Sequence, residues 1–357
     1  MTESGALVEI SNAEAALERA SDIHDMLNLR DAAMAYAVFA DAQAFKEAAQ
    51  KAKIFQLKAE RKAGGWLEEY GPEHGGDRSS SHDENLKLED LDIDHNESSR
   101  WQLEAKLPEA KFNTWTDDCL ATGKEVTAAG LRRQVREHQR EERVQEDKQA
   151  AEDLPAKGAS FELETMPFSA YRGKKGEATA IITDPPYSDD YLSLYEELGS
   201  FAEYHLRDGG SLLAMVGHAA LYGVIAALSA YLTYHWTIAY VMPGPHLMMY
   251  QLHVNTGWKP ILWFVKGKYI GQTVTDIITA GSAEKDQFAW QQGEVGFAKL
   301  VADFSRPGEL VIDPMCGTGT TGVAAVGLGR RFVGVDINPD RIATAKVRIN
   351  ERASRKA

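Results

Sequence analysis

The stretch Glu309–Gly322 reads ELVIDPMCGTGTTG, and RFVGVDINP follows it at Arg331–Pro339. The first stretch starts as a short apolar, β-prone run, passes through an acid and a proline, and continues through a glycine-rich turn into helix-forming residues. Gly317 and Gly319 let the backbone approach a ligand closely, as in the loops that bind nucleotide-type cofactors. The second stretch is another predicted strand, and the acid at its end, Asp336, is well placed to bond ribose hydroxyls. Together the two stretches predict a cofactor half-site.

The region from residue 156 onward repeats this pattern of short apolar runs, each followed by a turn or a helix. The runs are TAIITDPPY (179–187), GGSLLAMVG (209–217), WTIAYVMPG (236–244) and KPILWFVKG (259–267). Helical segments are expected at 191–206 and 320–328. Strands that alternate with helices form a largely parallel sheet covered on both faces. Residues 156–357 are therefore predicted to form a doubly wound α/β domain.

The tetrapeptide Asp184-Pro185-Pro186-Tyr187 directly follows an apolar run, which places it at the carboxyl end of a predicted strand. Open α/β sheets bind ligands at that edge. The prolines fix the backbone and leave carbonyl oxygens free as rigid acceptors. An acid, a fixed carbonyl and an aromatic ring suit a planar ligand with an exocyclic amine, because the oxygens hold the amine hydrogens while Tyr187 stacks on the ring. An ordinary strand-ending turn is the alternative interpretation.

These two motifs, in this order, resemble the S-adenosylmethionine-dependent methyltransferases that modify adenine N6 or cytosine N4 in DNA. In that family a DPPY-type tetrapeptide is the catalytic motif. The catalytic motif here precedes the cofactor loop, as in the β-type permutation of the family, and the resemblance covers roughly residues 161–350. It implies a seven-stranded, mostly parallel, Rossmann-like sheet and S-adenosyl-L-methionine as the cofactor.

The resemblance also implies roles for individual residues. The target amine and base would be held by Asp184, Pro185, Pro186 and Tyr187. The cofactor would be held by Asp313, Pro314, Met315, Gly317, Gly319, Thr320, Asp336 and Gln292. Met315 stands where the family more often has Phe, and it can still supply an apolar contact. The segment Trp290-Gln291-Gln292 matches the family more loosely, and a surface turn is an equal interpretation of it.

The β-type order predicts how the sheet is completed. After Asp336 one helix, at about 338–350, remains before the basic end of the sequence. The strand beside it must come from elsewhere, and residues 160–164 are the expected supplier. A hairpin-like pair, 236–242 and 261–266, would close the sheet with one antiparallel strand.

Residues 1–155 are predicted to form a helical N-terminal region. The Ala-rich segment 12–66 favours two or three helices that end at Gly64-Gly65. The stretch 71–90 is rich in Gly, Ser, Asp and His, which is typical of a loop or a partly disordered link. A possible helix-turn-helix lies near 86–106, with Asn96 as the cap of its second helix.

This helix-turn-helix would read DNA with the start of its second helix. The residues there are Ser98, Ser99, Arg100 and Gln102. A basic face nearby would be formed by Arg132, Arg133 and Arg136. A purely structural helical hairpin is an equal interpretation, because Asp and Glu are frequent before Asn96.

The 357 residues include 53 Asp plus Glu against 39 Lys plus Arg, a formal net charge of -14. Such a chain does not coat polyanions by bulk charge, so DNA contact would be local. The two cysteines, Cys119 and Cys316, exclude a disulfide framework, and the histidines show no metal-ligand pattern, so no metal is expected. No targeting or membrane-spanning segment is recognisable, which favours a cytoplasmic protein without membrane contact.

The combined expectation is a site-specific DNA adenine-N6 methyltransferase of phage or mobile-element type that acts on DNA. A homodimer is a further hypothesis, because a second copy would supply a second contact surface. Adenine is preferred because DPPY accompanies adenine more often than cytosine in the family. Cytosine N4 is the nearest alternative, and an RNA base or a protein glutamine is a more remote target. A DNA-binding regulator with a vestigial methylase domain is the alternative of a different class, whereas a nicotinamide-dependent dehydrogenase would leave DPPY unexplained.

Overall fold

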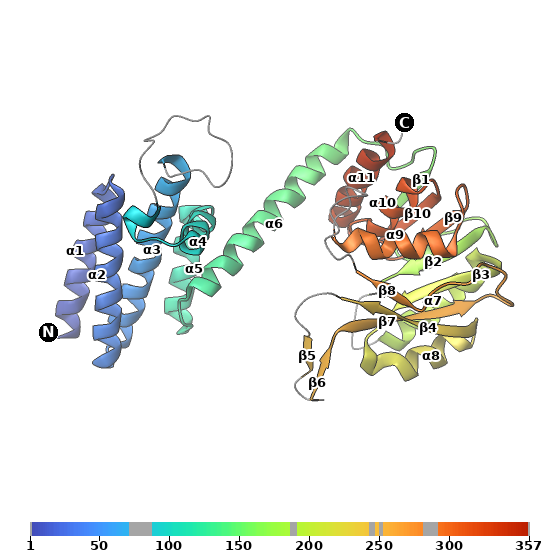
Figure 1. The fold of residues 1–357 in the computed structure, drawn as a ribbon, viewed down its shortest axis with the longest axis horizontal. Coiled ribbons are helices and arrows are strands. Elements are labelled where there is room, and N and C mark those ends of the chain that lie inside the picture. Colours follow the sequence, from blue (N-terminus) through green and yellow to red (C-terminus); the bar gives the residue numbers. More distant parts are fainter. Residues whose placement is uncertain are drawn as a thin grey trace. The chain divides into compact units, whose positions relative to one another are not determined.

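The computed structural model describes residues 2–70, 88–185, 191–242, 247–249, 253–280 and 292–355 (Figure 1). The chain divides into two compact units, Met1–Glu142 and Arg143–Ala357. The division lies inside helix α6 (Ala128–Glu152), which ends close to the boundary expected near residue 155. Each unit has hydrophobic cores of its own.

The N-terminal unit is helical throughout its described residues. Its elements are α1 (Glu3–Arg19), α2 (Ile23–Ala42), α3 (Lys46–Tyr70), the short 3-10 helix η1 (Leu88–Leu91), α4 (His95–Ala105), α5 (Glu109–Thr122) and the first part of α6. One core lies among α1, α2, α3 and α4, and a second lies among α3, α5 and α6.

Two helix ends differ from the expectation. Helix α1 begins at Glu3 and not near residue 12, because the Thr2 hydroxyl accepts a hydrogen bond from the Gly5 N–H and caps the helix there. Helix α3 continues through Gly64-Gly65 to Tyr70. A Cβ on Gly64 would lie 2.1 Å from the Trp101 carbonyl oxygen, so this glycine permits close packing of α3 on α4 and does not end the helix.

The expected helix-turn-helix is not formed as predicted within residues 88–105. Its first part is the single 3-10 turn η1, and residues 86 and 87 lie outside the described residues. Helix α4 begins one residue before Asn96, and its cap is Asp94, which exchanges hydrogen bonds with Glu97 in a capping box. Ser98, expected to face DNA, is fully buried. The face of α4 that contains Ser98 therefore packs into the core and does not face DNA.

An internal charge cluster joins α3, α4, α5 and α6. The Arg61 guanidinium donates to the Glu104 carbonyl and to the Glu109 carboxylate, at 3.1 and 2.8 Å. Arg132, expected on a basic face, donates instead to the carboxylate of Glu104 at 3.2 Å. Burial, together with the nearby charge of Glu60, raises the pKa of Glu104 to about 7. This part of the predicted basic face is therefore structural.

The raised pKa of Glu104 predicts pH-dependent stability of the N-terminal unit. A carboxyl whose folded pKa is raised favours the folded state when protonated, so stability falls as the pH rises from about 4.5 to about 7. Glu104→Gln is expected to remove this dependence, on the order of 1–3 kcal/mol, because the amide keeps an acceptor for Arg132 without a charge. Thermal unfolding of the parent chain and of Glu104→Gln at pH 5 and pH 8 measures this dependence. The same change in stability between the two pH values in both proteins would contradict the prediction.

The C-terminal unit contains an eight-stranded sheet among its described residues, in the order β1-β10-β9-β2-β3-β7-β4-β8. The strands are β1 (Phe161–Thr165), β2 (Ala178–Thr183), β3 (Leu206–Met215), β4 (Thr233–Val241), β7 (Trp258–Val265), β8 (Ile277–Thr279), β9 (Leu310–Asp313) and β10 (Arg331–Asp336). A separate two-stranded ribbon consists of β5 (Leu247–Met249) and β6 (Val254–Thr256).

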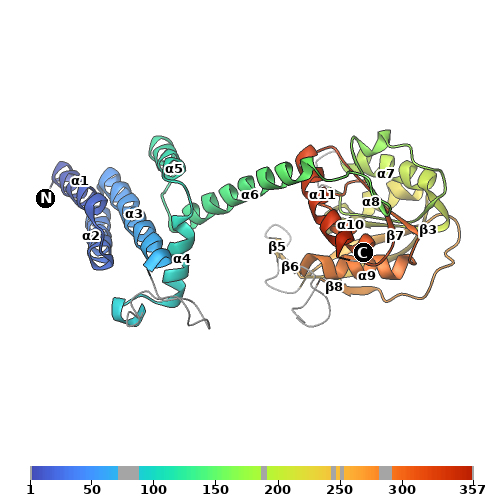
Figure 2. The same cartoon turned by 90° about the horizontal axis from the view of Figure 1, so that it is seen from above.

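Helices cover both faces of this sheet, as Figure 2 shows. Helices α9 (Gln292–Phe304), α10 (Thr320–Gly327) and α11 (Pro339–Ser354) pack on one face. Helices α7 (Tyr191–His205) and α8 (Leu221–Ser229) pack on the other. The alternation of side chains along β9 and β10 follows these faces, since Val311 and Phe332 belong to one core and Ile312 and Val333 to the other.

The expected completion of the sheet is confirmed. Strand β1 pairs in parallel with β10, from Phe161 opposite Phe332 to Thr165 opposite Asp336. Strand β7 runs antiparallel between β3 and β4. The three-residue strand β8 adds an eighth strand to the seven that were expected. The fold is thus a doubly wound, mostly parallel α/β sheet preceded by a helical region.

Candidate active site

A cavity of about 470 Å³ lies at the carboxyl edge of the sheet. It receives residues from the ends of β2, β9 and β10, which are neighbours in the sheet and run parallel, so their carboxyl ends lie at one edge. The expected residues that line it are Asp184, Pro185, Pro314, Met315 and Asp336. Two motifs that are more than a hundred residues apart in the sequence therefore share one cavity.

The glycine-rich loop between β9 and α10 is held by Asp313. One carboxylate oxygen of this buried residue accepts the Met315 N–H at 3.2 Å, and the other accepts the Thr321 hydroxyl at 2.6 Å. Gly317 and Gly319 both have positive φ, 51° and 81°, which other residues rarely adopt. A Cβ on Gly319 would also lie 2.8 Å from the Cβ of Ala345. The loop can therefore turn sharply only with glycines at these positions.

Asp336 connects this loop to the end of β10. Its carboxylate accepts the Gly317 N–H and the Asn338 N–H, both at 2.9 Å. The side chain is buried, yet it lines the cavity. Each carboxylate oxygen has two lone-pair directions, so Asp336 can accept further hydrogen bonds from hydroxyl groups of a ligand.

Two buried acids face this edge without a basic partner. Among the residues that the structure describes, no Lys or Arg forms an ion pair with Asp313 or Asp336. Burial raises the pKa of Asp313 to about 6, and the charge of Asp184 contributes to the shift. A buried carboxylate is stabilised by an opposite charge. The site is therefore suited to a ligand that brings positive charge and hydroxyl donors.

Asp184 is partly exposed and has a cationic neighbour that the sequence did not indicate. The Lys259 ammonium lies 3.7 Å from Oδ2 of Asp184. Lys259 belongs to β7, which is separated from β2 by β3, so its long side chain reaches across the sheet edge. The pairing could not be read from the sequence, because the two residues are distant in the chain and Lys259 is not part of the motif that contains Asp184.

Other cavity residues were also missed by sequence reasoning. They are Pro167, Phe168, Ser169, Leu194, Glu197, Ile337 and Arg341. Ile337 offers the clearest signal in retrospect, since it follows Asp336 directly and is an apolar side chain left 72% exposed. Such an exposed apolar group beside a cavity can pack against a planar ring. The others come from η2 (Phe168–Ala170) and its cap Pro167, from α7 and, for Arg341, from α11, and the positions of these elements depend on the tertiary fold.

Four expected cofactor residues are not among those that line the cavity: Asp313, Gly317, Gly319 and Thr320. Gly319 and Thr320 lie at the start of α10, where Arg348 of α11 approaches the Thr320 hydroxyl at 3.4 Å. Gln292 is the first residue of α9. Their cofactor roles therefore stay predictions. Pro186, Tyr187, Trp290 and Gln291 lie outside the described residues.

Within the described ranges, no group of three or more His, Cys, Asp or Glu is arranged to hold a metal ion. None of the helices described has the length and apolar character that crossing a bilayer requires.

Residues 171–347 match the family model described as DNA methylase, of the N6/N4 type. The Type II methyltransferase M2.LlaDCHI of Lactococcus lactis subsp. cremoris is 32% identical over 90 residues, which are 24% of this chain and 33% of that protein. The Type II methyltransferase M2.DpnII of Streptococcus pneumoniae is 33% identical over 85 residues, 22% of this chain and 31% of that protein. The chain spans about a third of the length of these curated relatives.

Two solved structures are similar to part of the chain. The M1.HpyAVI–SAM complex is 20% identical, covers 53% of this chain and 99% of its own, and has a TM-score of 0.44. The PvuII DNA methyltransferase (cytosine-N4-specific) is 12% identical, covers 57% of this chain and 94% of its own, and has a TM-score of 0.47.

The fold and the two motifs at its carboxyl edge define a Rossmann-like methyltransferase domain. The C-terminal unit of the chain belongs to the N6/N4 DNA methylase family. S-adenosylmethionine is the cofactor that this membership implies.

The residues present fit this cofactor. Its sulfonium and ammonium groups bring positive charge to Asp336, which lines the cavity, and to buried Asp313, which directly precedes the lining residue Pro314. Its ribose brings hydroxyl donors. Pro314, Met315 and Ile337 supply apolar surface for its adenine ring. The cavity of about 470 Å³ is within the range of small-molecule and cofactor sites.

The raised pKa of Asp313 predicts that S-adenosylmethionine binds more weakly in acid. The carboxylate attracts a cationic ligand only when ionised, so the dissociation constant is expected to be about tenfold higher at pH 5 than at pH 7.5. Isothermal titration calorimetry across this pH range measures it. Asp313→Asn should weaken binding at neutral pH and flatten the profile; an unchanged profile in this variant would contradict the assignment.

Proposed function

We propose that this protein transfers a methyl group from S-adenosylmethionine to the N6 amine of adenine in DNA. One observation carries the proposal: Asp184 and Pro185 of the DPPY motif line the same cavity as Pro314, Met315 and Asp336 of the cofactor loop. A methyl donor bound at the loop would thus lie close to an amine bound at the motif. Such placement converts a bimolecular reaction into an intramolecular one.

The chain's own groups position the nucleophile in this proposal. The carboxylate of Asp184 accepts one hydrogen of the target amine, and the Pro185 carbonyl accepts the other. These two bonds direct the nitrogen lone pair at the methyl group, while Tyr187 stacks on the base. S-adenosylmethionine, when bound, supplies an electrophilic methyl group on a sulfonium. Buried Pro185 and partly buried Met315 form an apolar wall that limits access of water to the reacting atoms.

DNA is the proposed partner because the family is one of DNA methylases. A base in a duplex must leave the stack to reach the cavity, at a cost of a few kcal/mol. We propose that the helical N-terminal region, residues 1–155, contributes to DNA contact and that the protein acts in the cytoplasm. A homodimer would provide a second contact surface; sedimentation of the chain with and without DNA tests it.

The preference for adenine rests on the resemblance, in which DPPY accompanies adenine more often than cytosine. The cavity walls suit either base, because adenine and cytosine both present an exocyclic amine beside a ring nitrogen. Cytosine N4 is therefore the second candidate. Membership in a restriction–modification system of phage or mobile-element origin belongs to the same proposal.

Mass spectrometry of nucleosides from DNA incubated with the chain and S-adenosylmethionine tests the proposal. N6-methyladenine is the expected product. N4-methylcytosine would keep the mechanism and replace the base. No product on duplex or single-stranded DNA, combined with DNA binding in the absence of cofactor binding, would instead favour a regulator with a vestigial methylase domain.

Lys259 is expected to support methyl transfer by holding the carboxylate of Asp184. Its ammonium lies 3.7 Å from that group, and the pair is partly exposed, so its effect should be moderate. Lys259→Met is expected to lower kcat about 3–10-fold with little change in the affinity for S-adenosylmethionine. Single-turnover kinetics measure it. Lys259→Arg should keep most of the rate, and equal loss in both variants would contradict a positioning role.

A further inference from the structure

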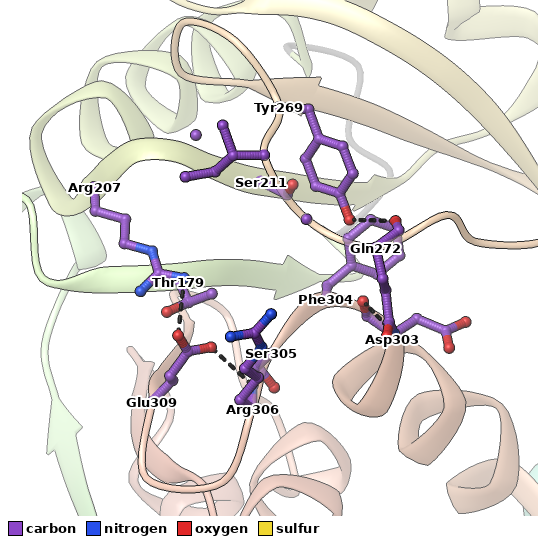
Figure 3. A pocket seen from close by; sticks show the side chains of 13 residues that line it. Thr179, Arg207, Ser211, Tyr269, Gln272, Asp303, Phe304, Ser305, Arg306 and Glu309 are labelled. Atoms are coloured by element: carbon purple, nitrogen blue, oxygen red, sulfur yellow. Dashed lines mark hydrogen bonds and ion pairs between the residues drawn. The ribbon is translucent and has the colours of Figure 1, made fainter.

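A second cavity, of about 160 Å³, lies at the opposite, amino edge of the same sheet. It is lined by the starts of β2 and β3, the loop that follows β7, and the segment between α9 and β9, as Figure 3 shows. Its volume is about ten times the roughly 10–15 Å³ that one water molecule requires. It shares no lining residue with the candidate active site.

The acceptors of this cavity are already engaged. Both oxygens of the Asp303 carboxylate bond the Lys299 ammonium, at 2.6 and 2.7 Å. The Glu309 carboxylate pairs with the Arg207 guanidinium at 2.8 Å and accepts the Arg306 N–H at 2.8 Å. Each acid is thereby neutralised by a neighbouring cation.

The backbone carbonyls around the end of α9 are also occupied. The Asp303 carbonyl accepts the side-chain amide of Gln272, and the Ser305 carbonyl accepts the buried guanidinium of Arg330. The negative end of the α9 dipole is thus capped by donors. The Gln272 carbonyl accepts the Tyr269 hydroxyl at 3.0 Å.

Donor groups of the cavity, in contrast, can still form hydrogen bonds. The Thr179 hydroxyl is buried, with the residue 7% exposed, and it has no hydrogen-bond partner. The Ser211 hydroxyl accepts from the Trp263 indole, which leaves its own hydrogen available to donate. In the part of the chain that the structure describes, no acidic side chain forms an ion pair with the Arg306 guanidinium.

We propose that this cavity binds a small oxyanion, such as a phosphate or carboxylate group. With Asp303 and Glu309 neutralised, Arg306 leaves the wall with one net positive charge. The hydroxyls of Thr179 and Ser211 supply two hydrogen bonds, and an acceptor-rich anion satisfies all three groups at once. A buried hydroxyl without a partner is costly, so a ligand that accepts from Thr179 stabilises the folded unit.

Isothermal titration calorimetry of the full chain with inorganic phosphate, at constant ionic strength, tests the proposal. We expect saturable binding to one site with a dissociation constant of about 1 mM. Thr179→Val and Arg306→Gln should each weaken it at least tenfold. Arg355→Gln, which removes an exposed arginine distant from the cavity in sequence, should leave it unchanged. If Thr179→Val unfolds, Arg306→Gln decides the test, because Arg306 is exposed and its replacement should not unfold the chain.

Two further arms identify the ligand and the site. Acetate in place of phosphate shows whether a carboxylate group suffices, and binding of either anion with the same variant sensitivity supports the site. Excess S-adenosylmethionine should leave phosphate binding unchanged. Competition between phosphate and S-adenosylmethionine would overturn the proposal, and so would the absence of binding by either anion. Binding that Thr179→Val and Arg306→Gln both leave intact would indicate an adventitious ion only and would overturn it as well. None of these outcomes depends on methyl transfer.

Discussion

Asp184→Asn is expected to lower the rate of methyl transfer about 10²–10³-fold while the affinity for S-adenosylmethionine stays within about twofold. The carboxylate presents only acceptors to the target amine, whereas an amide presents an NH₂ group at one of the two positions. A donor facing the amine repels it and turns its lone pair away from the methyl group. The side chain also loses its attraction to Lys259.

The measurement is a single-turnover rate of methyl transfer to DNA, together with calorimetric binding of the cofactor. Asp208→Asn is the matched control, because Asp208 is an exposed acid at the start of β3, on the opposite edge of the sheet. The control should retain the full rate. Equal rates in the parent chain and in Asp184→Asn would remove Asp184 from the proposed mechanism.

Asp336→Ala is expected to give the reverse pattern, with cofactor binding weakened about 100-fold. Each hydrogen bond to a charged group contributes roughly 1.5–3 kcal/mol, so the loss of even one bond to a ribose hydroxyl has a large effect. The Asp336 carboxylate also orders the cofactor loop before any ligand arrives, because it accepts the Gly317 and Asn338 N–H groups. The variant removes this acceptor.

Titration calorimetry with S-adenosylmethionine measures this effect, and Asp208→Ala is the control. Thermal unfolding of Asp336→Ala shows whether the loop alone or the whole unit is affected. Unchanged cofactor affinity in a folded Asp336→Ala would place the cofactor away from β10. Because Asp184→Asn is expected to impair the rate and Asp336→Ala the binding, the two variants together separate the two halves of the site.

Sequence reasoning succeeded where the signal is local. A short apolar run that ends in Asp-Pro or in a glycine-rich turn predicts a strand and its carboxyl end within a few residues, as at β2 and β9. The chain order of the motifs then required β1 to stand beside β10, which the register of Phe161 opposite Phe332 confirms.

It failed where a helix could be explained in two ways. Gly64-Gly65 looked like a helix end, but Gly64 allows the close approach of α3 to Trp101. Ser98 has the polarity of a DNA-reading residue, and yet it lies in the core of the N-terminal unit. Arg132 likewise pairs with buried Glu104. A polar residue on a helix reveals its role only through the element that packs against it.

The local identity of the motifs is thus contained in the sequence, because turns, caps and strand ends depend on neighbouring residues and because parallel strands bring their carboxyl ends to one edge. The pairing of Lys259 with Asp184, the exposure of Ile337 beside the cavity and the burial of Asp313 come only from the tertiary structure. The physical reason is that long-range packing decides which side chains meet and which lose their contact with water, and that loss of water raises the pKa of a carboxyl such as Asp313.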